Sequence, residues 1–129
     1  MTDLREIAKK FKFRYMENYT TNLMRDSINN GGKPLDEVLQ AKNTDGKWVT
    51  WICRMGRTIF VVGNTDNLNI WLYRTRKDLS AESIIDFASQ LNAWANGYGW
   101  SISLSSIVDP EDWQEIAHVS DAGEDPRYK

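Results

Sequence analysis

The sequence predicts one α+β domain built around an antiparallel sheet, and two observations support this class. Three consecutive segments rich in β-branched and aromatic residues lie in the middle of the chain, separated by short turn sequences. A segment with apolar residues at helical spacing, residues 81–95, follows them. At 129 residues the chain can bury roughly two-thirds of its unfolded surface, so it needs no disulfide to fold. We expect the domain to span residues 1–119 and an acidic, flexible tail to occupy residues 120–129.

Two structures compete for the N-terminal segment. Thr2 can cap a helix, and apolar residues then recur at helical spacing, so we expect a helix over residues 2–17. Phe11, Phe13 and Tyr15 nevertheless alternate with charged residues, which is the period of a strand. The sequence leaves open whether this segment is one helix or a helix followed by a strand.

Two shorter helical segments are expected next. The first begins near Thr21 and ends at the two asparagines and two glycines of residues 29–32, because such residues terminate helices. The second comprises one or two helical turns over residues 35–41, after Pro34. Together with the first segment, these are the N-terminal helices that we expect to pack on the sheet.

The first two central strands should form a hairpin. Residues 47–54 and 57–63 are rich in apolar side chains, and only residues 55–56, a methionine and a glycine, separate them. A two-residue loop that contains glycine is typical of a tight β-hairpin. This loop places Ile52 opposite Ile59.

A third strand should complete a three-stranded meander. After a polar loop over residues 64–67, it places Trp71 opposite Phe60. Because side chains alternate across a sheet, this register assigns each residue to a face. One face is aliphatic and ends in an arginine cluster, and it carries Ile52, Ile59, Leu72, Thr50, Val61, Ile70, Arg54, Arg57 and Arg74. The other face is aromatic, and it carries Trp51, Phe60, Trp71, Cys53, Thr58 and Tyr73.

The rest of the chain should add a helix, a strand and a short C-terminal helix. Ser80 is a suitable N-cap, and the helix over residues 81–95 should pack on the aliphatic face. Residues 98–105 alternate large apolar side chains with small ones, so we expect a fourth strand that joins the sheet after this crossover helix. Asp109 and Pro110 should open the last helix as its cap and first residue.

Composition excludes several classes of protein. The single cysteine, Cys53, cannot form an internal disulfide, and with one histidine, His118, it is too little for a zinc site. We therefore predict neither a metal nor a cofactor. No apolar run approaches the length of a transmembrane helix, and the N-terminus lacks the apolar core of a signal peptide. These features predict a cytoplasmic protein with no membrane partner.

No residue pattern predicts catalysis. Cys53 lies among apolar residues of a predicted strand, where a thiol is usually inert, so we do not pair it with His118 as nucleophile and base. Four carboxylates cluster in the last predicted helix, where the helix dipole favours them without any metal. The cluster consists of Asp109, Glu111, Asp112 and Glu115.

Two surfaces remain as candidates for a function. The aromatic face is either covered by the N-terminal helices or left open as an anchor, because Trp, Tyr and Arg dominate the energetics of protein interfaces. The arginine cluster requires a negative group, from the acidic C-terminal half of the chain, from another protein or from phosphate. The candidate partner-binding residues are Trp48, Trp51, Trp71, Tyr73, Arg54, Arg57 and Arg74.

These observations favour a small, non-enzymatic protein-binding module that acts as an inhibitor or adaptor. By composition alone it is similar to phage-encoded inhibitors of host or defence proteins and to immunity proteins. The alternative is a single-stranded nucleic-acid-binding protein that stacks bases on the aromatic face, although a net charge of −2 counts against it. Its phosphate-binding residues would be Arg54, Arg57, Arg74, Arg76 and Lys77. A small enzyme of unidentified class is the third hypothesis.

Overall fold

The computed structural model describes residues 3–19, 34–43, 45–64, 69–97 and 103–120. Its helices are α1 (Leu4–Phe11), α3 (Ala81–Ala95) and α4 (Leu104–Ile107). Its strands are β1 (Arg14–Tyr19), β2 (Leu35–Lys42), β3 (Trp48–Met55), β4 (Thr58–Asn64), β5 (Asn69–Thr75) and β6 (Trp113–Ser120). The predicted helix from Thr21 lies outside the described residues.

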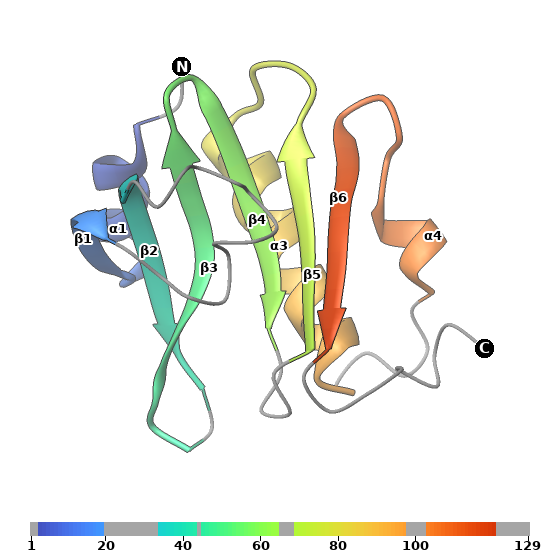
Figure 1. Ribbon diagram of the computed structural model, residues 1–129, viewed down its shortest axis with the longest axis horizontal. Coiled ribbons are helices and arrows are strands. Elements are labelled where there is room, and N and C mark those ends of the chain that lie inside the picture. Colours follow the sequence, from blue (N-terminus) through green and yellow to red (C-terminus); the bar gives the residue numbers. More distant parts are fainter. Residues whose placement is uncertain (1–2, 20–33, 44, 65–68, 98–102, 121–129) are drawn as a thin grey trace.

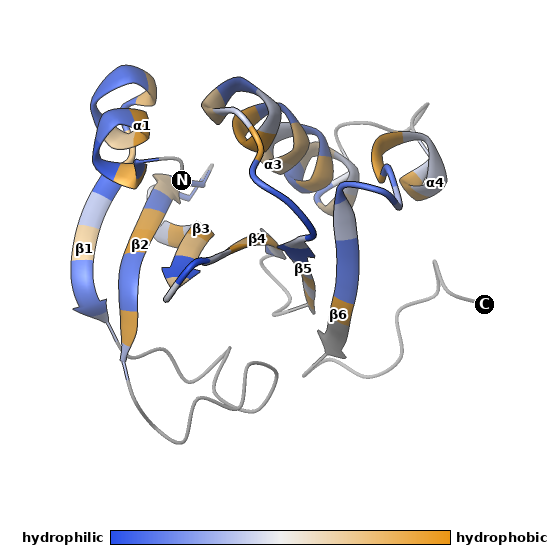
Figure 2. Ribbon diagram, turned by 90° about the horizontal axis from the view of Figure 1, so that it is seen from above, coloured by the Kyte–Doolittle hydropathy of each residue, from blue (hydrophilic) through white to orange (hydrophobic). Residues whose placement is uncertain are grey.

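The six strands form one antiparallel sheet in sequence order, from β1 at one edge to β6 at the other (Figure 1). The three described helices lie on the same side of this sheet (Figure 2). We call this side the helix face and the other side the opposite face. The predicted α+β class is therefore confirmed, but the sheet has six strands among the described residues where the sequence predicted four.

The first segment is a helix followed by a strand. Asp3 caps α1 by accepting a hydrogen bond from the backbone N–H of Arg5, and α1 ends at Lys12, which has a left-handed backbone with φ of 61°. The predicted helix over residues 2–17 is therefore too long. Strand β1 forms because Tyr15 packs onto the core of the helix face while Arg14 remains exposed, which is the alternation that a strand requires.

Residues 35–41 form strand β2, so the prediction of helical turns there is wrong. Strand β2 lies between β1 and β3 and is buried on both faces, with Val38 in one core cluster and Leu39 in the other. A strand buried on both faces shows no alternation in its sequence, and local reasoning cannot distinguish it from a helical segment.

The β3–β4 hairpin is displaced by two residues from its predicted register. Its loop is formed by Gly56 and Arg57, so that Met55 pairs with Thr58 and Ile52 pairs with Val61. Gly56 has a φ of +63°, and a type II′ turn places glycine at this first loop position. A shift of two preserves the faces, and Ile52 and Val61 share the helix face as predicted.

The β4–β5 register differs from the prediction by an odd number of residues, which exchanges the faces of β5. Phe60 pairs with Arg74 rather than with Trp71, because β4 continues to Asn64 before the loop begins. Trp71 and Tyr73 therefore lie in the core of the helix face, together with Val61. The predicted separation into an aliphatic and an aromatic face is wrong. The opposite face carries a second core that consists of Leu35, Val38, Cys53, Phe60, Val62, Ile70 and Leu72.

A β-bulge in β3 bends the sheet. Leu39 lies opposite Ile52, but the next residue of β2, Gln40, lies opposite Thr50, so Trp51 is an extra residue. Trp51 and Ile52 both pack on the helix face. The β3–β4 pairing extends only from Met55 to Ile52, and beyond the bulge the two strands part.

Helix α3 forms as predicted and covers β4. The side chain of Ser80 caps it by accepting a hydrogen bond from the N–H of Ser83, and its apolar side is buried against the sheet. The approach is close, since a Cβ atom added at Gly63 would lie 2.9 Å from Cγ of Leu91. Leu91 itself is fully buried.

Asn92 joins α3 to the part of β4 that has left the β3 ladder. Its Oδ1 accepts a hydrogen bond from the backbone N–H of Asn64 at 2.9 Å. Its Nδ2 donates to the carbonyl of Val62 at 3.0 Å and to the carbonyl of Ala88 at 2.9 Å. All these groups are buried, so Asn92 supplies the partners that β3 no longer provides.

The C-terminal region differs from the prediction in two ways. Leu104 begins the short helix α4, so the predicted strand over 98–105 is not formed at its end, and residues 98–102 lie outside the described residues. Asp109 and Pro110 precede a turn rather than a helix, and Trp113 begins strand β6, which pairs with β5. Of the predicted tail over 120–129, Ser120 ends β6 and the rest lies outside the described residues.

Substitution Leu91→Ala should lower the free energy of unfolding by about 2–5 kcal/mol, through lost burial and a residual cavity against Gly63. Chemical denaturation of the variant measures this loss. The exposed Ser89→Ala on the same helix is the matched control, and its effect should stay within about 0.5 kcal/mol. A loss below about 1 kcal/mol for Leu91→Ala would contradict the packing of α3 on β4.

Substitution Asn92→Leu should be destabilising although it adds apolar volume. It leaves the Asn64 N–H and the Val62 carbonyl buried without partners, at roughly 1–3 kcal/mol for each group. The control is Asn96→Ala, which removes hydrogen bonds from an exposed residue that water can reach. Equal losses of unfolding free energy for the two variants would show that Asn92 has no special role.

Candidate functional site

Trp48 is the exposed aromatic residue of the described structure. With 38% of its surface accessible, it is the one large hydrophobic side chain among the described residues that is classed as exposed. It is the first residue of β3, where it pairs with Lys42 at the end of β2. Because β3 and β4 part at the bulge, no β4 residue pairs with Trp48, and β2 is its strand neighbour.

Two cations lie over the Trp48 ring. The guanidinium carbon of Arg14 is 5.0 Å from the ring centroid, and Nζ of Lys42 is 5.3 Å from it. A polar row across β1 to β3 positions the arginine: Arg14 Nη2 donates to Gln40 at 2.7 Å, and Gln40 donates to Thr50 at 3.2 Å. Gln40 and Thr50 are buried, so this row is a fixed support. We call Arg14, Lys42 and Trp48 the basic-aromatic patch.

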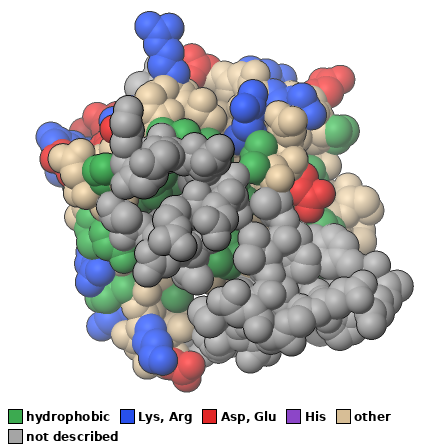
Figure 3. Space-filling view, in the orientation of Figure 1, with side chains coloured by type: hydrophobic (Ala, Val, Ile, Leu, Met, Phe, Trp, Pro, Cys, Tyr) green, Lys and Arg blue, Asp and Glu red, His purple; other side chains and the backbone are tan. Residues whose placement is uncertain are grey.

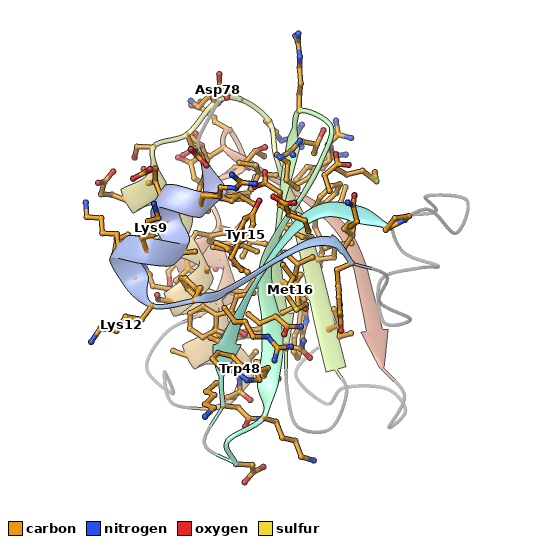
Figure 4. The ribbon with its side chains drawn as sticks, turned by 90° about the vertical axis from the view of Figure 1, so that its left-hand side faces the viewer. Lys9, Lys12, Tyr15, Met16, Trp48 and Asp78 are labelled. Carbon is orange, nitrogen blue, oxygen red and sulfur yellow. The ribbon has the colours of Figure 1, made fainter. Side chains whose placement is uncertain are left out.

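In the part of the chain that the structure describes, no carboxylate forms an ion pair with the cations of this region. Within the described ranges, neither Arg14 nor Lys42 takes part in an ion pair, and the same holds for Lys12 and Lys47, which lie close to them in sequence. One acidic residue, Asp45, lies in the β2–β3 hairpin near these cations in sequence. Figure 3 shows basic and hydrophobic side chains together along the left margin of the opposite face, and Figure 4 shows Trp48 at the lower end of the sheet.

The aromatic residues predicted to bind a partner do not lie together. Trp71 and Tyr73 are buried, with 0% and 2% of their surfaces accessible, and they contact the rings of Trp94 and Phe87 at 5.0 Å and 5.4 Å. Trp51 is half-buried, and its ring lies 5.6 Å from that of Phe13. Among the four predicted aromatic residues, Trp48 is therefore the one available to a partner.

The predicted arginine cluster is divided between the two faces. Arg54 is half-buried and forms ion pairs with Asp36 and Glu37, so its charge is neutralised within the chain. It pairs with Ile59 in the sheet, whereas Arg74 pairs with Phe60 and points to the opposite face. This arrangement does not bring the predicted phosphate-binding arginines together on one surface.

The three remaining predicted cations are exposed near the same end of the sheet. Arg57 lies in the β3–β4 turn, and Arg76 donates through Nε to the carbonyl of Trp113 at 3.4 Å. Nζ of Lys77 lies 3.0 Å from a carboxylate oxygen of Asp112, and this hydrogen bond raises the pKa of Lys77.

A polar network ties α1 to the first three strands on the helix face. Arg5 donates to Tyr15 at 3.2 Å and to Glu17, and Arg54 donates to Glu37. The Tyr15 hydroxyl contacts both carboxylates, Glu17 at 3.1 Å and Glu37. The hydrogen bond from Arg5 holds the pKa of Glu17 below its usual value. The hydrogen bond from Arg54 to Glu37 raises the pKa of Arg54. The charges of this network are therefore satisfied internally.

The candidate catalytic groups have structural roles. Cys53 is fully buried, and burial raises the pKa of its thiol, which disfavours the nucleophilic thiolate. Asp109 caps a turn by accepting a hydrogen bond from the N–H of Glu111, and Asp112 pairs with Lys77. Glu115 lies in β6, so the predicted helix N-terminus does not exist. Within the described ranges, no three His, Cys, Asp or Glu side chains form a group that could hold a metal ion.

Reasoning from the sequence identifies Trp48 but misses Arg14 and Lys42. The predicted helix over residues 2–17 contains Arg14, and no predicted strand contains Lys42, so the sequence does not predict the contact of either residue with Trp48. The alternation of Phe11, Phe13 and Tyr15 with charged residues is the signal that indicates β1 and therefore the position of Arg14.

No described helix combines the length and hydropathy that crossing a bilayer requires.

Tyr15 should ionise at higher pH than an ordinary tyrosine. Burial raises the pKa of its hydroxyl from 10.0 to about 12, and the hydrogen bond to Glu37 acts in the same direction. Because the folded state holds the proton more tightly, the associated stability is present below pH 10 and is lost as the pH rises to about 12. Ultraviolet titration of the chain and of Tyr15→Phe measures this. The number of late-titrating tyrosines should fall by one in Tyr15→Phe, and an unchanged number would show that the assignment is wrong.

Comparisons of this chain with protein-family models, with curated proteins and with solved structures found no match.

Proposed function

We propose that this chain is a small binding protein that recognises an acidic surface of another protein through the basic-aromatic patch. One observation carries the proposal: Trp48 is exposed while Arg14 and Lys42 lie over its ring. Tryptophan and arginine are among the residue types most enriched at the positions that dominate the energetics of protein interfaces.

The charge of the patch defines the partner. Arg14 and Lys42 have no carboxylate partner among the described residues, although Arg5, Arg54 and Lys77 do. Two unpaired cations close together repel each other, and an acidic partner would relieve this repulsion. Complementary charge also steers association and excludes basic partners.

The arrangement of aromatic residues favours a protein over a nucleic acid. A single-strand binder needs several exposed rings on which successive bases stack, and Trp71 and Tyr73 are buried in the core. The net charge of −2 opposes binding to a polyanion. Nucleic-acid binding is the second candidate function, because the unpaired cations around Trp48 would also suit phosphate.

A role as inhibitor or adaptor follows from the same features. A binding protein with one anchored patch acts by occluding or linking its partner, and the compositional similarity to phage-type inhibitors and immunity proteins agrees with this role. The raised pKa of the buried Cys53 thiol argues against its use as a nucleophile. The chain has a single cysteine, which is buried and cannot form an internal disulfide, and the absence of internal disulfides is typical of proteins in a reducing compartment, so we propose a cytoplasmic location.

Substitution Trp48→Ala should weaken partner binding by about 2 kcal/mol or more, because an aromatic anchor of an interface is removed. The partner is captured from cells of the native source with the immobilised chain and identified by mass spectrometry. The affinities of the variants are then measured by calorimetry. Thermal unfolding should show that Trp48→Ala keeps its fold, because the side chain is exposed.

Two controls separate the alternatives. Lys42→Glu reverses a charge of the patch, whereas Lys9→Glu reverses an exposed charge on α1, so only the first should weaken binding. Single-stranded oligonucleotides are titrated at low salt while tryptophan fluorescence is followed. Saturable quenching that Trp48→Ala abolishes would replace the protein-binding proposal by nucleic-acid binding. Partner binding that neither Trp48→Ala nor Lys42→Glu weakens would overturn the proposal that the basic-aromatic patch binds the partner.

A further inference from the structure

Strand β1 is an edge of the sheet that no other described element covers. It pairs with β2 on one side, and no helix or strand of the described structure lies beyond its other side (Figures 1 and 2). In Figure 4 this edge faces the viewer, and β1 crosses in front of β2 and β3. An edge strand carries a row of backbone N–H and C=O groups that can accept another strand.

The usable part of this edge is short and has defined ends. Lys12 has a φ of 61° and Asn18 a φ of 51°, and these left-handed residues interrupt the extended backbone on both sides. Such interruptions limit uncontrolled pairing at sheet edges. The segment between them, residues 13–17, suits the addition of one short extended segment.

The side chains along this edge differ between the two faces. Tyr15 and Glu17 point to the helix face, where Arg5 already neutralises Glu17. Arg14 and Met16 point to the opposite face, the same face as the Trp48 ring. The charge of this edge that no described carboxylate neutralises is therefore positive, and it is the charge of Arg14 in the basic-aromatic patch.

We propose that the partner adds an extended acidic segment to the outer edge of β1, with a carboxylate beside Arg14 and an apolar side chain beside Met16. This inference rests on the proposed function and specifies the form in which the partner is recognised. Main-chain hydrogen bonds to β1 supply affinity, and the alternate side chains supply specificity. A matching segment places an acidic and an apolar residue two positions apart, because these share one face.

A second copy of this chain does not fit the same edge. In an antiparallel pair related by a two-fold axis perpendicular to the sheet, each side chain lies opposite one from the same face. Arg14 would then meet Arg14, Met16 or Asn18 of the other copy. The one carboxylate of β1, Glu17, is on the other face. Charge complementarity therefore selects a different, acidic chain.

The test uses a synthetic peptide, acetyl-TETVTETVT-amide, in which glutamate and valine occupy alternate positions of one face. Titration followed by nuclear magnetic resonance should show saturable binding. Hydrogen exchange should slow at alternate backbone amides within residues 13–17, because the N–H groups that point away from β2 gain acceptors. The peptide with lysine in place of glutamate should not bind. Absence of binding, or binding without protection of these amides, would overturn the proposal.

Two further comparisons test the geometry. Peptides N-methylated on one or the other set of alternate residues lose donors on opposite edges, so one should fail to bind and the other should bind normally. Equal binding of both would contradict strand addition. Arg14→Glu should weaken binding by about tenfold or more through like-charge repulsion, whereas Lys9→Glu should not. If the peptide fails while capture of the partner protein still depends on Trp48, the proposed function stands and strand addition falls.

Discussion

The fold depends on how Asn92 of α3 satisfies the end of β4. The bulge at Trp51 turns β3 away from β4, and this leaves backbone groups of Val62 and Asn64 without partners in the β3 ladder. Buried backbone groups of this kind are costly unless they are hydrogen-bonded. The carboxamide of Asn92 accepts a hydrogen bond from the Asn64 N–H and donates one to the Val62 carbonyl. Gly63 lies between them and lets Leu91 approach the strand closely. One turn of α3 thereby fixes both the position of the helix and the end of the central strand.

The same separation of strands explains the exposed tryptophan. Beyond the bulge, residues 48–50 of β3 pair with β2 but not with β4, so Trp48 lies at the free end of a two-strand extension. Trp71, on strand β5 between β4 and β6, is enclosed instead by α3 and neighbouring strands. Burial of one tryptophan and exposure of the other thus follow from the position of each in the sheet. The support of Arg14 through Gln40 and Thr50 holds the cation where Trp48 emerges.

The chain separates its charges between the two faces near β1. On the helix face, Arg5 and Arg54 are paired with Glu17 and Glu37, and this network holds α1 to the strands. On the opposite face, Arg14 is left without a carboxylate among the described residues. A cation that is supported by hydrogen bonds but not neutralised is available to an external anion. For this reason the basic-aromatic patch and the adjacent edge, rather than the other arginines, carry the proposed function.

The sequence by itself determined the elements that depend on local signals. Helix α3 follows from its N-cap and its apolar spacing. The β3–β4 hairpin follows from its glycine turn, and its register differs from the prediction by two residues, which leaves the paired side chains on their predicted faces of the sheet. The identity of β2 and β6 was set by the tertiary structure, because β2 is buried on both faces of the sheet and β6 pairs with β5, a strand distant in sequence. The tertiary structure also decided which tryptophan is exposed. An odd displacement of β5 exchanges its two faces, and that displacement follows from how far β4 continues before its loop begins, which no local pattern encodes.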